Sequence, residues 1–234
     1  MDDNFHWDNI AEDYNNWVNG DTDIFGQLIS QKRQDTFNSL LNNPINKTIL
    51  DLGCGEGIIG RLFSNNNNLF GIDYSEKLIQ IAQTKDKKIE YKVADIQNGL
   101  PYQNNQFDFI VSNMVLMDIE RIDELIQDVY KKLKVSGIFI FSIKHPCFDK
   151  NWLNQGNPNF KYLDSFEVEK KLNPNFDSFC KGFHRPIEFY INVLLKSDFK
   201  ITIFKEVKIN QNIKSLKNYD LIANDLFIGC IKND

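Results

Sequence analysis

The residues in this sequence whose types and spacing could do chemistry begin with three alternating glycines. Gly53, Gly55 and Gly57 follow an apolar run, 48–52, and a segment with helical spacing, 58–64, begins directly after them. Glycines at such a turn let the backbone bend sharply and approach a ligand closely. The free N–H groups at the start of a helix favour a negatively charged group. The spacing therefore predicts a ligand-binding loop between a strand and a helix.

Three aspartates occur at equal intervals along the chain, each at the end of an apolar run rich in β-formers. They are Asp51, Asp73 and Asp95. Parallel strands bring their carboxyl ends to one edge of an open sheet, and ligands bind along that edge. There, Asp73 is placed to accept hydrogen bonds from both hydroxyls of a ribose. The alternative is that these side chains cap the helices that follow, a role for which Asp is well suited.

Two other nucleotide-binding motifs do not fit this loop. The dinucleotide fingerprint of dehydrogenases is G-x-G-x-x-G/A. Counted from Gly53, its sixth position is occupied by Ile58. The phosphate loop of nucleoside triphosphatases needs a Gly-Lys-Ser/Thr sequence, which does not occur. The loop therefore matches neither the dehydrogenase fingerprint nor the phosphate loop.

The glycine loop and the aspartates need a sheet to position them, and the apolar pattern predicts one. Short apolar runs alternate with helical patterns, which is typical of parallel βαβ units with helices on both sheet faces. We expect strands at 48–52, 69–72, 89–94, 107–112 and 138–143, with a helix at 121–133. A helix at 186–195 and strands at 200–208 and 225–231 complete the pattern. Two consecutive strands joined by a loop can pair antiparallel, so we expect an antiparallel pair at the end of an otherwise parallel α/β sheet.

We expect one domain over residues 1–234 with two elaborations. Apolar side chains at three- and four-residue spacing predict helices in an N-terminal cap, 1–45. Residues 146–183 carry Asn, Pro, Gly and many aromatic side chains without clear periodicity, and a structureless loop of that length is uncommon. We predict that this segment is an inserted lid with short helices. A packing excursion without a functional role is the alternative.

Composition and charge argue against several classes of partner. The chain has 234 residues, 42% hydrophobic and 25% charged, and a formal net charge of −5. Nucleic-acid-binding proteins usually carry a basic face, so this charge disfavours such a partner. The longest apolar runs are too short for a bilayer and the first residues do not resemble a signal peptide, so we expect a cytoplasmic protein. Four scattered cysteines without a CxxC pair predict no metal site.

Together, these motifs resemble those of the class I, Rossmann-like S-adenosylmethionine-dependent methyltransferases. The likeness runs from residue 48 to residue 143. Asp51–Gly57 is similar to the family's first motif, 71–75 to its second, 94–96 to its third and 107–111 to its fourth strand. The resemblance implies S-adenosyl-L-methionine as the cofactor. It also implies a seven-stranded, mostly parallel sheet whose last strand is antiparallel.

The resemblance further implies roles for individual residues. Asp51 and Gly53 would meet the methionyl amino end of the cofactor, and Asp73 would take its ribose hydroxyls. Asp95 and Ile96 would lie at the adenine edge. The remaining implied residues are Asn113 beside the methionine portion, Gly55, Cys54 and Tyr74 around the loop, and Tyr14 and Trp17 closing the site from the N-terminal helix.

The reaction implied by the resemblance requires mainly alignment. A sulfonium is already a strong methyl donor, so positioning the nucleophile and excluding water carry the rate. A general base is needed only if the acceptor is protonated at neutral pH. His145, in a His-Pro-Cys-Phe run, and His184, in a His-Arg-Pro run, resemble positions in a subset of small-molecule methyltransferases. We predict that they are catalytic, with loop packing as the alternative for each.

The sequence narrows the class of acceptor without naming it. Residues 112–115 after the fourth strand are Ser-Asn-Met-Val, where an Asn-Pro-Pro-Tyr motif would point to amino groups of bases or glutamine. Pro146-Cys147 looks like the nucleophile of cytosine methylation but follows the fifth strand instead of the fourth. We predict in-line methyl transfer to an O or N atom of a small-molecule acceptor. The alternatives are a non-catalytic subunit that binds the cofactor, and an RNA methyltransferase, which the net charge disfavours.

Overall fold

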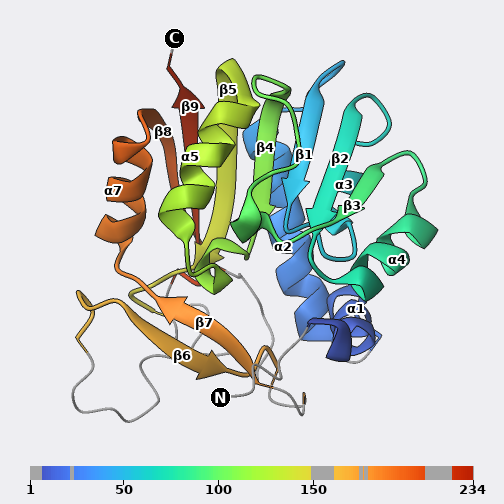
Figure 1. Ribbon diagram of the computed structural model, residues 1–234. Coiled ribbons are helices and arrows are strands. Elements are labelled where there is room, and N and C mark those ends of the chain that lie inside the picture. Colours follow the sequence, from blue (N-terminus) through green and yellow to red (C-terminus); the bar gives the residue numbers. More distant parts are fainter. Residues whose placement is uncertain are drawn as a thin grey trace.

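A seven-stranded sheet forms the centre of the molecule (Figure 1). The structure is a computed structural model that describes residues 7–21, 24–148, 161–173, 176, 179–208 and 223–233. Within these residues, the strands lie in the order β3-β2-β1-β4-β5-β9-β8. Their bounds are β1 Thr48–Leu52, β2 Asn68–Asp73, β3 Glu90–Val93, β4 Phe107–Asn113, β5 Leu133–Lys144, β8 Phe199–Val207 and β9 Asp225–Lys232.

All strands of this sheet except β9 run in one direction. β1 pairs in parallel with β2 and β4, β2 with β3, and β4 with β5. β9 is antiparallel to both of its neighbours, β5 and β8. The expected α/β fold, with a mostly parallel sheet and an antiparallel last strand, is confirmed. The carboxyl ends of β1, β2, β4 and β5 meet at the lower edge of the sheet in Figure 1.

Helices cover both faces of the sheet (Figure 1). Their bounds are α1 Ala11–Asn19, α2 Ile24–Leu41, α3 Ile58–Arg61, α4 Glu76–Lys85, α5 Ile122–Lys132 and α7 Ile187–Lys196, with short 3-10 helices η1 Trp7–Asn9, η2 Ile96–Asn98 and η3 Leu116–Asp118. One apolar core lies between the sheet and α5 and α7, and a second between the sheet and α2 and α3. The neighbours Ile49 and Leu50 belong to different cores because successive strand side chains point to opposite faces. No helix in the described ranges is long and apolar enough to cross a bilayer.

Residues 146–183, where we expected short helices, contain strands in part of their length. β6 Phe166–Lys170 and β7 Cys180–His184 pair antiparallel as a separate two-stranded sheet below the carboxyl edge (Figure 1). The helical expectation is wrong for these strands because their burial has the two-residue period of a strand: Val168 is buried while Glu167 is exposed. Residues 149–160, 174–175 and 177–178 of this segment lie outside the described residues.

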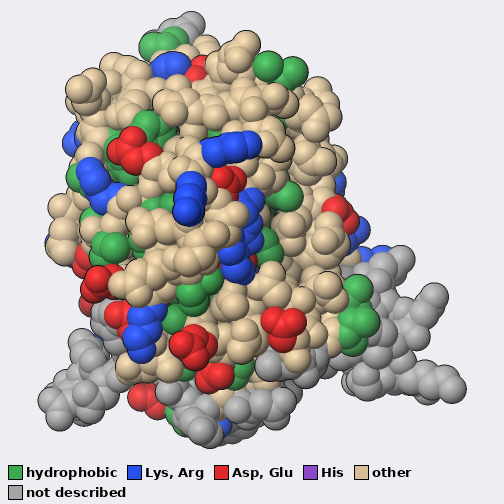
Figure 2. Space-filling view, turned by 90° about the vertical axis from the view of Figure 1, so that its right-hand side faces the viewer, with side chains coloured by type: hydrophobic (Ala, Val, Ile, Leu, Met, Phe, Trp, Pro, Cys, Tyr) green, Lys and Arg blue, Asp and Glu red, His purple; other side chains and the backbone are tan. Residues whose placement is uncertain are grey.

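The face that carries β3 and α4 has basic and acidic side chains intermingled (Figure 2). This distribution differs from the clustered basic face that is typical of nucleic-acid-binding domains.

Candidate functional site

A cavity of about 500 Å³ opens at the carboxyl edge of the sheet. Its walls come from the carboxyl ends of β1, β2, β3, β4 and β5 or the segments directly after them, from η1, α1, α2 and α4, and from β7 and the segment before it. The residues predicted from the sequence that line it are Tyr14, Trp17, Gly53, Gly55, Asp73, Tyr74, Asp95 and Asn113. The fold therefore gathers into one cavity residues that are far apart in the chain.

The glycine loop presents its backbone to this cavity. Gly53 and Gly55 have φ angles of 69° and 52°, in the left-handed region that glycine adopts without steric cost. A Cβ atom at Gly53 would approach Val115 Cγ2 to 2.4 Å. A Cβ atom at Gly55 would meet, within the described part of the chain, only Tyr14 Cε1 at 3.9 Å. The space in front of Gly55 is therefore open to a ligand that contacts the backbone.

Asp73, at the end of β2, holds the loop and lines the cavity at the same time. Its Oδ2 accepts a hydrogen bond from Gly55 N at 2.8 Å, and its Oδ1 accepts one from Ser75 N at 3.0 Å. Burial raises the pKa of Asp73, and these two N–H groups oppose the rise. Each carboxylate oxygen has a second lone pair, so the side chain keeps capacity for a ligand. The N-cap of α4 is Ser75, so Asp73 is not the helix cap.

Asp95 matches the capping alternative and also lines the cavity. Asp95 is the N-cap of η2, and its Oδ1 accepts a hydrogen bond from Gln97 N at 2.9 Å. Asp95 is also one of the residues that line the cavity. Its neighbour Ile96 is buried and does not line the cavity.

Asp51 and Cys54 lie behind the loop instead of in the cavity wall. Asp51 is 2% exposed, and its Oδ2 accepts a hydrogen bond from Gly60 N at 2.9 Å. Its Oδ1 is buried without a hydrogen-bond partner among the described residues. Burial raises the pKa of Asp51 to about 7, although the Gly60 N–H group opposes the rise. The buried thiol of Cys54 packs beneath Gly71.

The end of β4 carries a strained backbone at the cavity wall. Met114 has a φ of 61°, which residues other than glycine rarely adopt. Its N–H donates to Ser142 O at 3.0 Å, and Ser142 Oγ donates to Asn113 Oδ1 at 2.8 Å. The neighbouring strand β5 therefore fixes both Asn113 and Met114. Strain held in place by surrounding contacts is common at functional sites.

Aromatic side chains from the N-terminal elements form one wall of the cavity. The ring centroids of Trp7 and Tyr14 are 5.5 Å apart, and those of Tyr14 and Trp17 are 6.3 Å apart. Trp17 also packs against Phe176, with centroids 6.2 Å apart. Trp17 Nε1 is buried with no hydrogen-bond partner in the described ranges. Such a wall suits a cationic ligand, because the faces of aromatic rings are electronegative.

A buried ion pair closes the cavity beside β5 and β9. Arg33 of α2 and Lys144 of β5 both line it. Arg33 Nε and Nη2 donate to the two carboxylate oxygens of Asp225 at 2.8 and 3.1 Å. Lys144 Nζ lies 4.0 Å from the same carboxylate. Burial would raise the pKa of Asp225, but the charges of Arg33 and Lys144 outweigh it and hold that pKa below its ordinary value.

Neither His145 nor His184 lines the cavity. His145 is 1% exposed; its Nε2 lies 2.8 Å from Glu206 Oε1, and its Nδ1 accepts a hydrogen bond from Cys147 N at 3.3 Å. His184 is equally buried, and its Nε2 donates to Tyr162 O at 3.0 Å. A general base must reach the proton that it removes. These positions give no support to the predicted catalytic role of either histidine and agree with the packing alternative.

Several cavity residues were not among the predicted site residues. They are Trp7, Arg33, Leu78, Gln97, Met114, Val115, Met117, Asp118, Ile119, Glu120, Lys144, Leu172, Lys181 and Phe183. Met114 and Val115, directly after β4, and Lys144, at the end of β5, could have been predicted in the same way as the aspartates, because ligands bind at the carboxyl ends of parallel strands. No sequence pattern predicted that Arg33 lies in the cavity wall, because its partner Asp225 is at the other end of the sequence.

The chain is similar in sequence to known methyltransferases. A family model described as a methyltransferase domain matches residues 50–141. An uncharacterized protein of Haemophilus influenzae is 30% identical over 73% of this chain and 74% of its own length. A demethylmenaquinone methyltransferase of Leptospira interrogans is 28% identical, over 39% of this chain and 41% of its own length.

The structure is similar as well. A crystal structure assigned as an S-adenosylmethionine-dependent methyltransferase of Listeria monocytogenes has a TM-score of 0.77 at 25% identity, covering 89% of this chain and all of that one. The residues matched by the family model include the glycine loop, Asp73, Asp95 and Asn113. The strand order, the cavity at the carboxyl edge and these relatives together show that the chain belongs to the class I, Rossmann-like family of S-adenosylmethionine-dependent methyltransferases.

Proposed function

We propose that this chain transfers the methyl group of S-adenosylmethionine to an oxygen or nitrogen atom of a small-molecule acceptor. Membership of the family makes the chain a transferase that uses S-adenosylmethionine, so the proposal concerns the acceptor. The observation that carries it is the composition of the cavity. The glycine loop and Asp73 line it together with apolar side chains such as Leu172 and Phe183. Its volume of about 500 Å³ lies within the range of small-molecule sites.

The residues present fit the cofactor. The open space before Gly55 admits a ligand against the loop backbone, and Asp73 keeps lone pairs for hydroxyl groups. The rings of Trp7 and Tyr14 suit a positively charged sulfur. When bound, S-adenosylmethionine supplies an electrophilic methyl group on a sulfonium.

We assign each part of the cavity wall a role toward that cofactor. Asp73 accepts hydrogen bonds from the ribose hydroxyls, and Asp95 lies at the adenine edge with Ile96 packed behind it. Gly53, Gly55 and Asn113 contact the methionyl part. Asp51 and Cys54 are buried and support the loop from behind. Tyr14 and Tyr74 close the site. For Asp73, Asp95, Gly53, Gly55, Asn113, Tyr14 and Tyr74, the assignment rests on the position of each residue in the cavity wall.

The chain's contribution to the chemistry is alignment and exclusion of water. Holding two reactants in an attack geometry replaces a costly encounter by a step within one complex. The aromatic wall and Met117 cover the cavity with apolar surface. In this proposal His145 and His184, which are buried outside the cavity wall, take no part in the transfer step. A small acceptor is also supported by the relative from Leptospira interrogans, because its name, demethylmenaquinone methyltransferase, refers to a small-molecule acceptor.

A non-catalytic subunit that only binds the cofactor is the competing function. The two are separated by incubating the protein with S-adenosylmethionine labelled on the methyl carbon and a metabolite library. We expect label to move to at least one small molecule. Cofactor binding without transfer to any library member, in a protein that remains folded, would favour the binding subunit.

The purified protein is expected to bind S-adenosylhomocysteine and not NAD. Asp73 is available to a ribose in both ligands, but Ile58 occupies the position where the dinucleotide fingerprint has its third glycine. Calorimetric titration with each ligand is the measurement. Binding of NAD in the absence of S-adenosylhomocysteine binding would contradict the proposed function.

The affinity for the cofactor is expected to rise with pH around neutrality. The pKa of Asp51 is about 7, so its carboxyl is partly protonated in the free protein. Raising the pH ionises it and adds negative charge behind the loop, which favours the cationic S-adenosylmethionine over the uncharged thioether of S-adenosylhomocysteine. We expect the ratio of the two affinities to change roughly threefold to tenfold between pH 6 and pH 8.

The control for this pH effect is Asp51→Asn, which keeps the shape of the side chain but cannot ionise. The affinity ratio of the variant should be independent of pH over the same interval. A wild-type ratio that does not change with pH would show that the charge of Asp51 does not reach the bound cofactor.

A further inference from the structure

The cofactor loop has one buried charged side chain that the proposed function does not use. Glu56 lies between Gly55 and Gly57 and is 1% exposed. Its Oε2 accepts a hydrogen bond from Arg61 Nη2 at 2.9 Å and forms a second ion pair with Lys85 Nζ. Burying a carboxylate is costly unless it is paired, so these two cations make its position possible.

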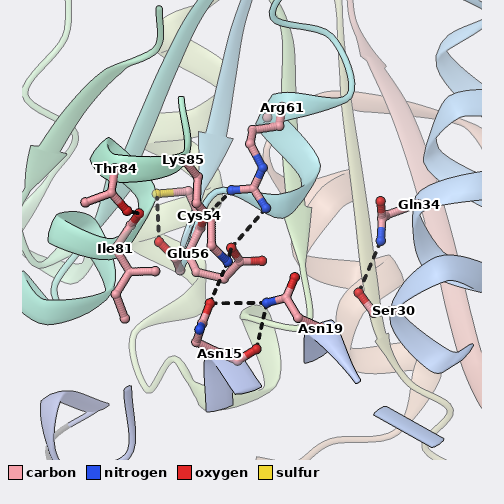
Figure 3. Close-up of polar contacts among 12 residues, drawn as sticks. Asn15, Asn19, Ser30, Gln34, Cys54, Glu56, Arg61, Ile81, Thr84 and Lys85 are labelled. Carbon is pink, nitrogen blue, oxygen red and sulfur yellow. Dashed lines mark hydrogen bonds and ion pairs between the residues drawn. The ribbon is translucent and has the colours of Figure 1, made fainter. Parts of the chain in front are cut away.

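Lys85 joins this carboxylate to the N-terminal helix. It is the last residue of α4, and its Nζ also donates to Asn15 Oδ1 on α1 at 2.5 Å. Figure 3 shows Glu56, Lys85 and Asn15 meeting from three different elements, with Asn19 continuing the network along α1. One ammonium group therefore links the underside of the cofactor loop to the helix that covers the cavity.

The helix held in this way carries cavity residues. Tyr14 is the neighbour of Asn15 in sequence, and both Tyr14 and Trp17 line the cavity. Tyr14 Cε1 is the atom that stands before Gly55. A change in the distance between α1 and the loop would therefore change the width of the cofactor space.

A second contact holds the same segment at the opposite end of α4. The carboxylate of Asp8 accepts hydrogen bonds from Ser75 Oγ at 2.5 Å and from Lys77 N at 3.1 Å. The N-terminal elements are thus attached to both ends of α4, the helix that follows Asp73. Asp8 holds η1, and Lys85 adds a polar link to α1, whose Trp17 and Val18 are also buried.

We propose that Lys85 is a positioning residue for the cofactor: it fixes α1 against the glycine loop so that Tyr14 and Trp17 close over the bound ligand. This inference rests on the proposed function and deepens it. Lys85 touches neither the cavity nor the reacting atoms, and it acts only through α1. Cofactor release then requires α1 to separate from the loop, so loss of the link speeds release.

The test compares Lys85→Met with two matched variants. We expect Lys85→Met to weaken S-adenosylhomocysteine binding about tenfold, the effect of one lost charge-assisted contact. Amide hydrogen exchange of α1 in the ligand-free protein should become faster by a similar factor. Lys85→Arg, which keeps the charge and the donors, should restore both values. Lys88→Met removes an exposed lysine that bonds Asn65 instead of α1, and it should change neither.

A double variant separates action through α1 from action on the loop. In a Tyr14→Ala background the aromatic cover is already lost, so adding Lys85→Met should weaken binding by less than twofold. A full tenfold effect in that background would overturn the proposal, because Lys85 would then act through Glu56 on the loop itself.

Two further outcomes are decisive. If Lys85→Met fails to fold, Asn15→Ala breaks the link at α1 and leaves the Glu56–Lys85 pair intact; it should reproduce faster exchange in α1. Unchanged exchange in both variants would overturn the role of Lys85. Failure of wild-type protein to bind S-adenosylhomocysteine would contradict the proposed function, while the exchange of ligand-free α1 still decides whether Lys85 fixes that helix.

Discussion

Asp73→Ala is expected to weaken S-adenosylhomocysteine binding by roughly 30-fold to 1000-fold, the equivalent of about 2–4 kcal/mol. Two effects combine. The ribose loses its carboxylate partner, and Gly55 N and Ser75 N lose the acceptor that shapes the loop. Calorimetric titration measures the affinity, and the melting temperature shows that the variant is folded.

Two variants accompany this measurement. Asp86→Ala removes a half-buried aspartate at the other end of α4, outside the cavity, whose Oδ1 accepts a hydrogen bond from Lys88 N, and should bind like wild type. Asp73→Asn keeps the size of the side chain and one acceptor oxygen, so its affinity should be intermediate. If Asp73→Ala melted normally and bound as tightly as wild type, Asp73 would serve only to shape the turn.

Among the variants proposed for this protein, Arg33→Met is expected to lower the free energy of unfolding the most. Asp225 is 1% exposed, and Arg33 donates to both of its oxygens, so the variant removes both of these hydrogen bonds and leaves a buried carboxylate with Lys144 Nζ 4.0 Å away. Breaking a buried pair on one side costs about 3–5 kcal/mol. For a chain of this size, that loss corresponds to a fall in melting temperature of roughly 6–20 °C.

The pH dependence of this loss has a definite sign. The pKa of Asp225 is held below its ordinary value in the folded protein, mainly because Arg33 outweighs the effect of burial. The pair therefore stabilises the fold fully above the ordinary pKa of an aspartate, about 4, and this contribution is lost as the pH falls through the depressed value. Wild type and Arg33→Met should converge in stability toward acid pH.

The control for the ion pair is an exposed one. Glu124→Gln removes the carboxylate that Arg121 meets at 3.4 Å on the surface of α5, where the Glu124 side chain is 66% exposed. Exposed pairs contribute little, so this variant should melt close to wild type. The double variant Arg33→Met with Asp225→Asn should recover part of the lost stability, since no unpaired charge remains buried. A melting temperature for Arg33→Met equal to that of wild type would show that the pair contributes nothing net.

The elements closest to the chemistry were readable from the sequence because their signals are local. β1 occupies the expected range, 48–52, and β4 and β5 include theirs. The apolar runs alternate with helical patterns at short range, and that alternation alone predicts the parallel sheet. The position of Asp73 and Asp95 in the cavity wall follows from the same rule, since carboxyl ends of parallel strands share an edge.

In residues 146–183, the sequence pattern predicts short helices, whereas the structure has the strands β6 and β7 there. The aromatic side chains of this segment obscured a short two-residue alternation, and a two-stranded sheet gains its stability from packing on the rest of the protein. The orientation of the two histidine rings depends on contacts that are distant in the sequence. Their sequence runs place His145 and His184 near strand and helix ends, but Glu206 and Tyr162, which determine where the rings point, come from distant positions.

The sequence by itself therefore determined the α/β fold, the glycine loop and the aspartates at strand ends, because each depends on contacts within a few residues or on a rule of sheet topology. The tertiary structure alone decided which side chains enter the cavity and which are buried behind it. Arg33 reaches the cavity wall through its bond to Asp225, and Lys85 reaches α1 through Asn15. Such pairs are separated along the chain by most of a domain or by several elements. Their proximity is a property of packing that no local pattern encodes.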